Sequence, residues 1–229
     1  MNHLVIGPLL LPLITGVVLI LLRGSAARVR RALSGAATLA LVGVALALLL
    51  RVSDGEVLVY QLGNWPAPFG IVLVADRLAA IMLLITALLA ANVVLYAVRG
   101  ADHSGRYFQV LFQLQLFGLN GAFLTGDLFN LFVFFEVLLI ASYGLLLQGG
   151  GRERTRAGLH YVVLNLIGST LFLFAVGALY GLLGTLNMAD LAQRLAESAP
   201  ADLGLVRAAG LLLFVVFALK AALAPLHLW

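Results

Sequence analysis

Long apolar runs, separated by short polar segments, dominate the pattern of hydrophobic and polar positions along this chain. A helix that crosses a bilayer needs roughly 20 mostly apolar residues. Runs of about that length predict seven membrane-spanning helices, near residues 4–22, 32–50, 77–98, 107–124, 128–147, 159–183 and 204–224. The pattern therefore predicts an all-α polytopic membrane protein.

Two of the polar segments carry patterns of their own. The segment EVLVYQLGNWPAPFGIVLVAD, residues 56–76, has two β-prone stretches around a turn rich in Gly, Asn and Pro. It predicts a short β-hairpin on the outer face, with an irregular loop as the alternative. In the segment NMADLAQRLAES, residues 187–198, Met188, Leu191 and Leu195 share one helical face. That spacing predicts a short amphipathic helix that lies on the membrane surface.

The composition agrees with a membrane protein, because 63% of the residues are hydrophobic and only 10% are charged. A soluble domain has about 45–50% apolar and about 25% charged residues. The net charge of +4 does not require a nucleic-acid partner, since basic residues of membrane proteins gather in cytoplasmic loops. The chain has no cysteine, which excludes disulfides and thiolate metal sites. It also has no glycine-rich nucleotide motif and no HExxH motif, so we expect neither a cofactor nor a metal site.

The arginines are distributed unequally between the two sides of the membrane. Nine fall on one side of the predicted spans: Arg23, Arg28, Arg30, Arg31, Arg99, Arg106, Arg152, Arg154 and Arg156. Four fall on the other side: Arg51, Arg77, Arg194 and Arg207. Because cytoplasmic loops carry the excess of positive charge, the nine belong in the cytoplasm and the N-terminus is predicted to lie outside.

One carboxylate lies deep within an apolar run. The segment GDLFNLFVFFEVLLIASYGLL, residues 126–146, carries Asp127 at its second position, which is well placed to cap a helix. Glu136 follows nine residues later, about 13.5 Å along a helix axis and near the middle of a hydrocarbon layer about 30 Å thick. A carboxylate at that depth is costly unless it faces protein or water, so we interpret Glu136 as functional. The alternative is a structural hydrogen bond from a protonated Glu136.

The only lysine poses the same problem with the opposite charge. Lys220 lies in FALKAALAPLHLW, residues 217–229, about 20 Å along a helix from Arg207. Pro225 removes a backbone donor and clashes with the carbonyl of Ala221, so we expect the last helix to be discontinuous there. Such breaks often mark the ion site of a transporter. His227 can exchange a proton near neutral pH, although a single histidine often makes only a structural hydrogen bond.

Glu136 and Lys220 together suggest a mechanism. Removal from water favours the neutral form of each group, whereas bringing the two together stabilises both charges. A change in their separation would then move a proton, so we interpret them as a proton-transfer pair.

Uncharged polar residues also lie within the apolar runs. Gln109, Gln113 and Asn120 form roughly one stripe of the segment 107–124, and the segment 159–183 contains Asn165 and Ser169. Gln113, Asn120 and Asn165 are candidates for a hydrated polar path. Hydrogen bonding between neighbouring helices is the alternative, and we favour it because such bonds are common in helix bundles.

Two stretches resemble a known family. GDLFNLFVFFEVLLIASYGLL and LKAALAPLHLW are similar to the antiporter-like proton-channel family, which includes the large membrane subunits of respiratory complex I and of Mrp-type multisubunit Na⁺/H⁺ antiporters. The first stretch, together with DRLAAIMLLIT and GTLNMADLA, most resembles the D subunit of the Mrp type. The likeness covers essentially the whole chain.

The resemblance implies roles for particular residues. Glu136 and Lys220 match the proton-transfer pair of the family, the turn before Pro225 matches its helix break, and His227 matches the histidine of its PLHxW motif. Family members are about twice this length and contain two inverted repeats of five helices. We therefore expect an incomplete antiporter-like fold, with three spans and the hairpin in residues 1–106 and a truncated first repeat in residues 107–229.

The resemblance also implies a function. The protein would be a secondary transporter and not an enzyme, exchanging cytoplasmic Na⁺, or alternatively Li⁺ or K⁺, for external H⁺. It would be a multi-pass subunit of a hetero-oligomeric complex in the bilayer of the bacterial inner membrane. The alternative is a proton-pumping membrane subunit of a complex I-like NADH–quinone oxidoreductase or a membrane-bound hydrogenase, which would use the same residues.

Overall fold

The computed structural model describes residues 3–100, 102, 105, 107–197 and 203–226. Apolar helices correspond to all the predicted spans: α1 (Gly7–Leu21), α2 (Ala27–Val52), α3 (Arg77–Ala97), α4 (Phe108–Leu124), α5 (Leu128–Leu147), α6 (Arg152–Leu183) and α8 (Leu203–Lys220). Six of these are long and apolar enough to cross a membrane, the first together with the 3₁₀ turn η1 (His3–Ile6). The 17 residues of α4 span about 25 Å, less than the hydrocarbon layer. The predicted fold class is confirmed.

Two helix starts were predicted wrongly. The structure begins α2 at Ala27 and α6 at Arg152, so each extends beyond its apolar run by more than one turn. The arginines that we placed in the connecting loops are helical instead: Arg28, Arg30, Arg31, Arg152, Arg154 and Arg156. Arginine and alanine are strong helix formers, so these helices continue out of the apolar layer, where hydropathy no longer marks them.

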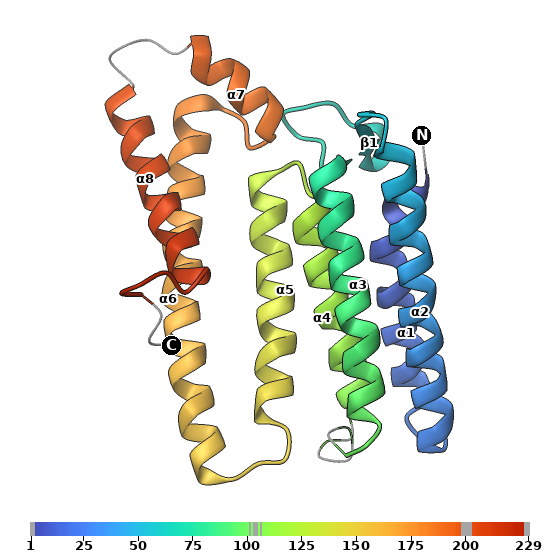
Figure 1. The fold of residues 1–229 in the computed structure, drawn as a ribbon. Helices are drawn as coiled ribbons and strands as arrows, with labels where there is room; N and C mark the ends of the chain where they lie inside the picture. Colours follow the sequence, from blue (N-terminus) through green and yellow to red (C-terminus); the bar gives the residue numbers. More distant parts are fainter. Residues whose placement is uncertain (1–2, 101, 103–104, 106, 198–202, 227–229) are drawn as a thin grey trace. The chain divides into compact units, whose positions relative to one another are not determined.

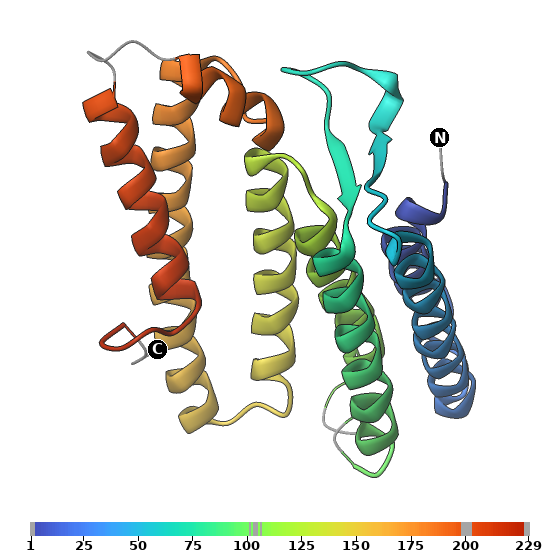
Figure 2. The same cartoon turned by 45° about the horizontal axis from the view of Figure 1, so that its top comes forward.

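The two smaller predicted elements are present. Strands β1 (Leu58–Gln61) and β2 (Val72–Ala75) pair as a hairpin, with the 3₁₀ turn η2 (Leu62–Asn64) after β1 (Figure 2). Gly63 and Asn64 have φ of 64° and 57°, the left-handed conformation that such a turn requires and that Gly and Asn adopt most readily. The predicted amphipathic helix is α7 (Met188–Glu197).

The chain folds as two compact units that are not continuous in sequence. The first unit comprises Met1–Tyr60, Leu73–Thr125 and Phe134–Gly150. In it α1 packs against α2 and α4, and α2 packs against α3 (Figure 1). The predicted division of the chain at residue 106 stays a prediction.

A proline in α1 shapes the core of the first unit. Pro12 lies inside α1 and has no N–H, so the carbonyl of Pro8, four residues earlier, has no helical donor. The side chain of Asn120, which is fully buried in α4, donates from Nδ2 to that carbonyl at 2.8 Å. Asn120 therefore supplies the hydrogen bond that Pro12 removes.

Gln113 makes a second polar contact across the same unit. Its Nε2 donates to the hydroxyls of Ser34 and Thr38 in α2, at 3.0 and 3.3 Å. Gln113 and Asn120 thus both bond to neighbouring helices, as in the alternative that we favoured, and the hydrated path through them stays a prediction.

The second unit comprises Gln61–Val72, Gly126–Val133 and Gly151–Trp229. In it α6 and α8 lie side by side, and α7 follows α6 after Gly184, which ends α6 in the left-handed conformation at φ 68° (Figure 1).

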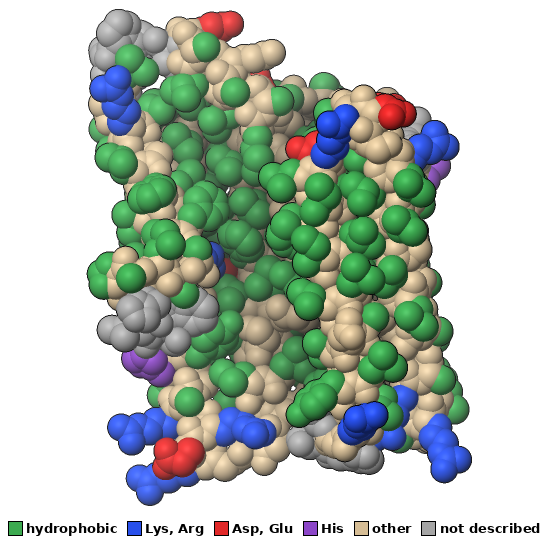
Figure 3. Space-filling model, viewed as in Figure 1, with side chains coloured by type: hydrophobic (Ala, Val, Ile, Leu, Met, Phe, Trp, Pro, Cys, Tyr) green, Lys and Arg blue, Asp and Glu red, His purple; other side chains and the backbone are tan. Residues whose placement is uncertain are grey.

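In the space-filling view, hydrophobic side chains cover the middle of the helices and most Lys and Arg side chains lie toward their ends (Figure 3). This distribution is the one expected of helices that cross a membrane.

Replacement of Asn120 by alanine is expected to destabilise the first unit by about 1–2 kcal/mol, because the carbonyl of Pro8 would be buried without a donor. The free energy of unfolding in mixed detergent micelles measures the change. Asn92→Ala is the matched control, since Asn92 is exposed and bonds to the carbonyl of Leu88 in its own helix. Equal stability of the two variants would contradict this role of Asn120.

Candidate functional site

The start of α5 is fixed by a cap. Oδ1 of Asp127 accepts a hydrogen bond from the backbone N–H of Asn130 at 2.8 Å, and Asp127 is buried. This confirms the predicted helix cap, which satisfies one of the free N–H groups of the first turn.

A backbone array holds the same end of α5. Leu128 N–H donates to the carbonyl of Leu186 at 2.9 Å, and Met188 N–H donates to the carbonyl of Gly126 at 2.8 Å. Gly126 N–H in turn donates to the carbonyl of Val72 in the hairpin segment at 2.9 Å. The start of α5 is thereby tied to the connection between α6 and α7. Sequence reasoning missed this array, because pairing between distant segments leaves no local pattern.

Glu136 lies on the side of α5 that is turned away from α4. A Cβ on Gly118 would lie 2.7 Å from the backbone nitrogen of Leu138, and one on Gly121 would meet the ring of Phe134. These glycines let α4 approach α5 along the face that carries Phe134 and Leu138. Glu136 lies two residues from each, about 200° around the helix.

The carboxylate of Glu136 is partly buried. Its Oε1 is buried and makes no hydrogen bond among the residues that the structure describes. A carboxylate oxygen in such a position calls for a donor from a partner, a cation or water.

Lys220 is the last residue of α8. Its Nζ donates to Oγ of Ser169 in α6 at 3.3 Å, and the side chain is half-buried. Glu136 and Lys220 belong to different units, so their predicted pairing stays a prediction.

Helix α8 ends at Lys220, five residues before Pro225, and the predicted discontinuity at Pro225 stays a prediction. Leu223 N–H donates to the carbonyl of Ala218 at 3.0 Å, and Ala222 N–H donates to that of Leu219 at 3.1 Å. With φ of 53° at Ala222, these bonds form a Schellman motif, which ends α8 before Pro225 is reached. Pro225 lies in the turn that follows, and His227 lies outside the described residues.

An aromatic cluster lies next to Lys220 in the second unit. The ring of Phe172 in α6 is fully buried and contacts Phe132 of α5 and Phe217 of α8, with centroids 5.9 and 5.8 Å apart. Ser169 precedes Phe172 by one turn, and Lys220 follows Phe217 by one turn. The contact between Lys220 and Ser169 thus lies one helical turn from these ring contacts.

The third residue of the predicted polar path lies on α6. Asn165 is buried, and its Nδ2 donates to the carbonyl of Tyr161 at 2.9 Å within the same helix. It precedes Ser169 by four residues and shares its face. Within the described ranges, no group of three or more His, Asp or Glu side chains could hold a metal ion.

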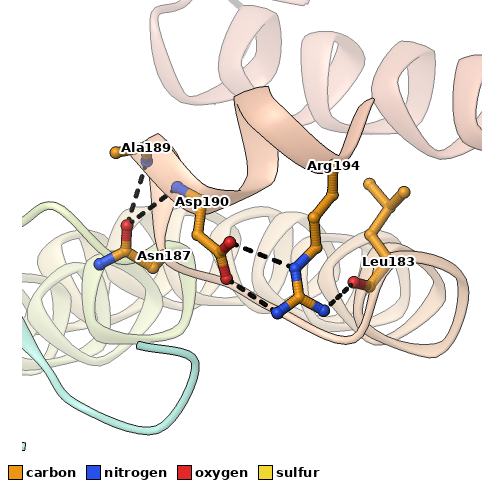
Figure 4. A network of polar contacts seen from close by, with 5 residues as sticks. All are labelled: Leu183, Asn187, Ala189, Asp190 and Arg194. Carbon is orange, nitrogen blue, oxygen red and sulfur yellow. Dashed lines mark hydrogen bonds and ion pairs between the residues drawn. The ribbon is translucent and has the colours of Figure 1, made fainter. Parts of the chain in front are cut away.

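A polar network holds α7 to the end of α6 (Figure 4). Oδ1 of Asn187 accepts from the N–H groups of Ala189 and Asp190 and so caps α7. The guanidinium of Arg194 pairs with the carboxylate of Asp190 at 3.2 Å and donates to the carbonyl of Leu183 at 2.9 Å.

The same network acts on the charge of Asp190. The hydroxyl of Thr185 and then the guanidinium of Arg194 hold the pKa of this carboxyl below its usual value. The negative charge of Asp190 is therefore stabilised by the contacts that dock α7.

The chain is similar to known membrane subunits. Residues 125–229 match the family model described as NADH:quinone oxidoreductase/Mrp antiporter, TM. The D subunit of the probable K⁺/H⁺ antiporter of Rhizobium meliloti is 49% identical, and that of the Na⁺/H⁺ antiporter of Alkalihalophilus pseudofirmus is 43% identical, each over 100% of this chain. The chain covers only 43% and 46% of them, so it spans less than half the length of these curated relatives.

Two solved structures show the same fold. A chain of the Mrp complex from Dietzia sp. aligns over 99% of this chain and 42% of its own length, with a TM-score of 0.89 and 35% identity. A chain of respiratory complex I from Thermus thermophilus aligns over 99% and 45%, with a TM-score of 0.78 and 29% identity.

The docking of α7 is expected to depend on pH. Since the pKa of Asp190 is lower in the folded state, its stabilising effect is present at neutral pH and is lost as the pH falls below about 4. Asp190→Asn should abolish this loss and already reduce hydrogen-exchange protection of α7 amides at pH 7. Glu197→Gln, an exposed substitution on the same helix, is the control and should behave as the wild type. Unchanged α7 protection in Asp190→Asn would show that the pair does not dock the helix.

Proposed function

Because this chain belongs to the family of NADH:quinone oxidoreductase and Mrp antiporter membrane subunits, we propose that it is part of the proton-translocating D subunit of a multisubunit monovalent cation/H⁺ antiporter. Glu136 and Lys220 are its proton-transfer pair. The observation that carries this proposal is the likeness to antiporter D subunits over the whole chain, at 49% and 43% identity.

Glu136 and Lys220 each follow a phenylalanine whose ring contacts Phe172. Phe132 contacts Phe172 within the second unit, and Glu136 follows Phe132 by four residues on the same face of α5. Phe217 contacts the same ring, and Lys220 follows it by one turn.

The chemistry of the pair suits a coupled transporter. Near each other and away from water, the carboxylate of Glu136 and the ammonium of Lys220 stabilise each other. A Na⁺ or K⁺ ion that approaches the carboxylate competes with the ammonium and favours release of the lysine proton. Cation movement and proton movement are then linked through one electrostatic interaction.

Other residues complete the proposed route. The proposed hydrated path to the proton-transfer pair is lined by the polar side chains of Asn165, Gln113 and Asn120. Beyond the predicted break at Pro225, His227 receives or supplies protons. The excess of arginine at one end of the helices favours an N-terminus outside the bacterial inner membrane. The remaining subunits of the antiporter complex are the expected partners.

The alternative is a proton-pumping membrane subunit of a complex I-like oxidoreductase or a membrane-bound hydrogenase. The fold is shared with a chain of respiratory complex I, but that chain is 29% identical, whereas the two antiporter subunits are 49% and 43% identical. The higher identity favours the antiporter.

The pair can be tested in the full-length subunit within its complex, in inverted membrane vesicles. Glu136→Gln removes the carboxylate charge, and Lys220→Arg keeps a positive charge that does not lose its proton. Each should reduce Na⁺- or K⁺-dependent proton release on the order of tenfold or more. Normal transport by Lys220→Arg would exclude proton transfer by Lys220.

Glu153→Gln is the matched control for loss of a carboxylate, because Glu153 is exposed in the first turn of α6. It should transport at the wild-type rate. Immunodetection of the complex in each vesicle preparation separates loss of transport from loss of assembly. Normal transport by Glu136→Gln would show that proton transfer does not need the carboxylate of Glu136.

A further inference from the structure

The helices α6 and α8 are in close contact where they carry Ser169 and Lys220. A Cβ on Gly168 would lie 2.9 Å from Cδ2 of Leu219, so the end of the Leu219 side chain would have to shift to admit it. The next residue on each helix makes the contact from Nζ of Lys220 to Oγ of Ser169 at 3.3 Å. The two contacts lie side by side, one residue apart on each helix.

A ring contact beside this one also joins the two helices. Phe172, one turn from Ser169, is fully buried and contacts the ring of Phe217, one turn from Lys220, in an edge-to-face arrangement. Ser169 itself is only 4% exposed. A buried hydroxyl needs a hydrogen-bond partner, and Lys220 supplies one here.

A serine hydroxyl suits a lysine that gains and loses a proton. Toward an ammonium group, which has only donors, Oγ of Ser169 acts as the acceptor. Toward a neutral amine, which has a lone pair, the same hydroxyl turns and donates its proton. The contact thus survives both states of Lys220, but it favours the ammonium because hydrogen bonds to charged groups are the stronger ones.

Few other charged groups face this contact. The remaining charged residue on the described part of α8 is Arg207, about 20 Å away along the helix. The titratable residues of α6 nearest to Ser169 in the chain are Tyr161 and Tyr180, at least two turns away. Glu136 on α5 is the carboxylate that the proposed function sets against Lys220.

We propose that Ser169 is a positioning residue that holds the Nζ of Lys220 and sets the pH range in which this lysine exchanges its proton. The inference rests on the proposed function of Lys220. It adds Ser169 of α6 to the proposed proton-transfer pair of Glu136 and Lys220.

The test measures cation-dependent proton release against pH in inverted vesicles that contain the full-length subunit in its complex. Ser169→Ala removes the acceptor of the ammonium, so the alkaline limb of the profile should shift by about 1 unit toward lower pH, the size expected for loss of a hydrogen bond to a charged group. Ser169→Thr keeps a hydroxyl and should restore the wild-type profile. If Ser169→Ala does not accumulate, Ser169→Cys, with a weak thiol acceptor, should shift in the same direction.

Thr170→Ala is the matched control. The exposed Thr170 adjoins Ser169, but its hydroxyl donates to the carbonyl of Leu166 within α6. Its profile should equal that of the wild type. An unchanged profile in the assembled Ser169 variants, or an equal shift in Thr170→Ala, would overturn the role of Ser169.

The result for Lys220→Arg separates this inference from the proposed function. If Lys220→Arg is inactive and the Ser169 variants keep the wild-type profile, the role of Lys220 stands and only that of Ser169 falls. If Lys220→Arg transports normally, the proton-transfer function fails, and the role of Ser169 fails with it.

Discussion

A bilayer offers no water to a polar group, so every break in a helix and every charge within it must find a partner in the protein. This constraint explains the polar contacts of the helices more directly than any other. In α1, Pro12 frees the carbonyl of Pro8, and Asn120 of the neighbouring helix supplies the missing donor. At the end of α8, the Schellman motif satisfies two carbonyls of the last turn, and Ser169 accepts from the amine of Lys220. Buried polar side chains are therefore found where a helix is interrupted or ends, because they bond to the groups there.

The sequence predicted the helices well because bilayer thickness alone sets the length of an apolar run. It failed at the starts of α2 and α6, where arginines continue a helix into water and hydropathy gives no signal. The cap at Asp127 was predictable, since it depends on residues within one turn. The backbone array from Val72 to Met188 was not, because it joins segments that are more than 50 residues apart in the chain.

The candidate site was found for a similar reason. Glu136 and Lys220 stand out because charge is rare in apolar runs, and a single sequence suffices to find them. Ser169 carries no such signal, since serine is common in membrane helices and its hydroxyl often bonds to its own backbone. The contact to Lys220 became visible only when α6 and α8 were placed side by side. For Gln113 and Asn120 the sequence favoured interhelical hydrogen bonds over a polar path, but only the positions of Ser34 and Pro8 identify their partners.

The position of Lys220 at the end of a helix bears on how it can work. The carbonyl end of a helix carries partial negative charge, which favours a cation in the last turn. The amine of Lys220 therefore has two sources of stabilisation that do not depend on Glu136, the end of α8 and the hydroxyl of Ser169. A buried lysine whose only partner was a carboxylate would lose that partner whenever the carboxylate bound a metal cation. Its unpaired charge would then cost a large amount of free energy. In the proposed mechanism, these two weaker partners continue to stabilise the ammonium of Lys220 when Glu136 binds a cation instead. A group that must take up and release protons repeatedly needs partners of moderate strength, because a proton held too tightly would not leave.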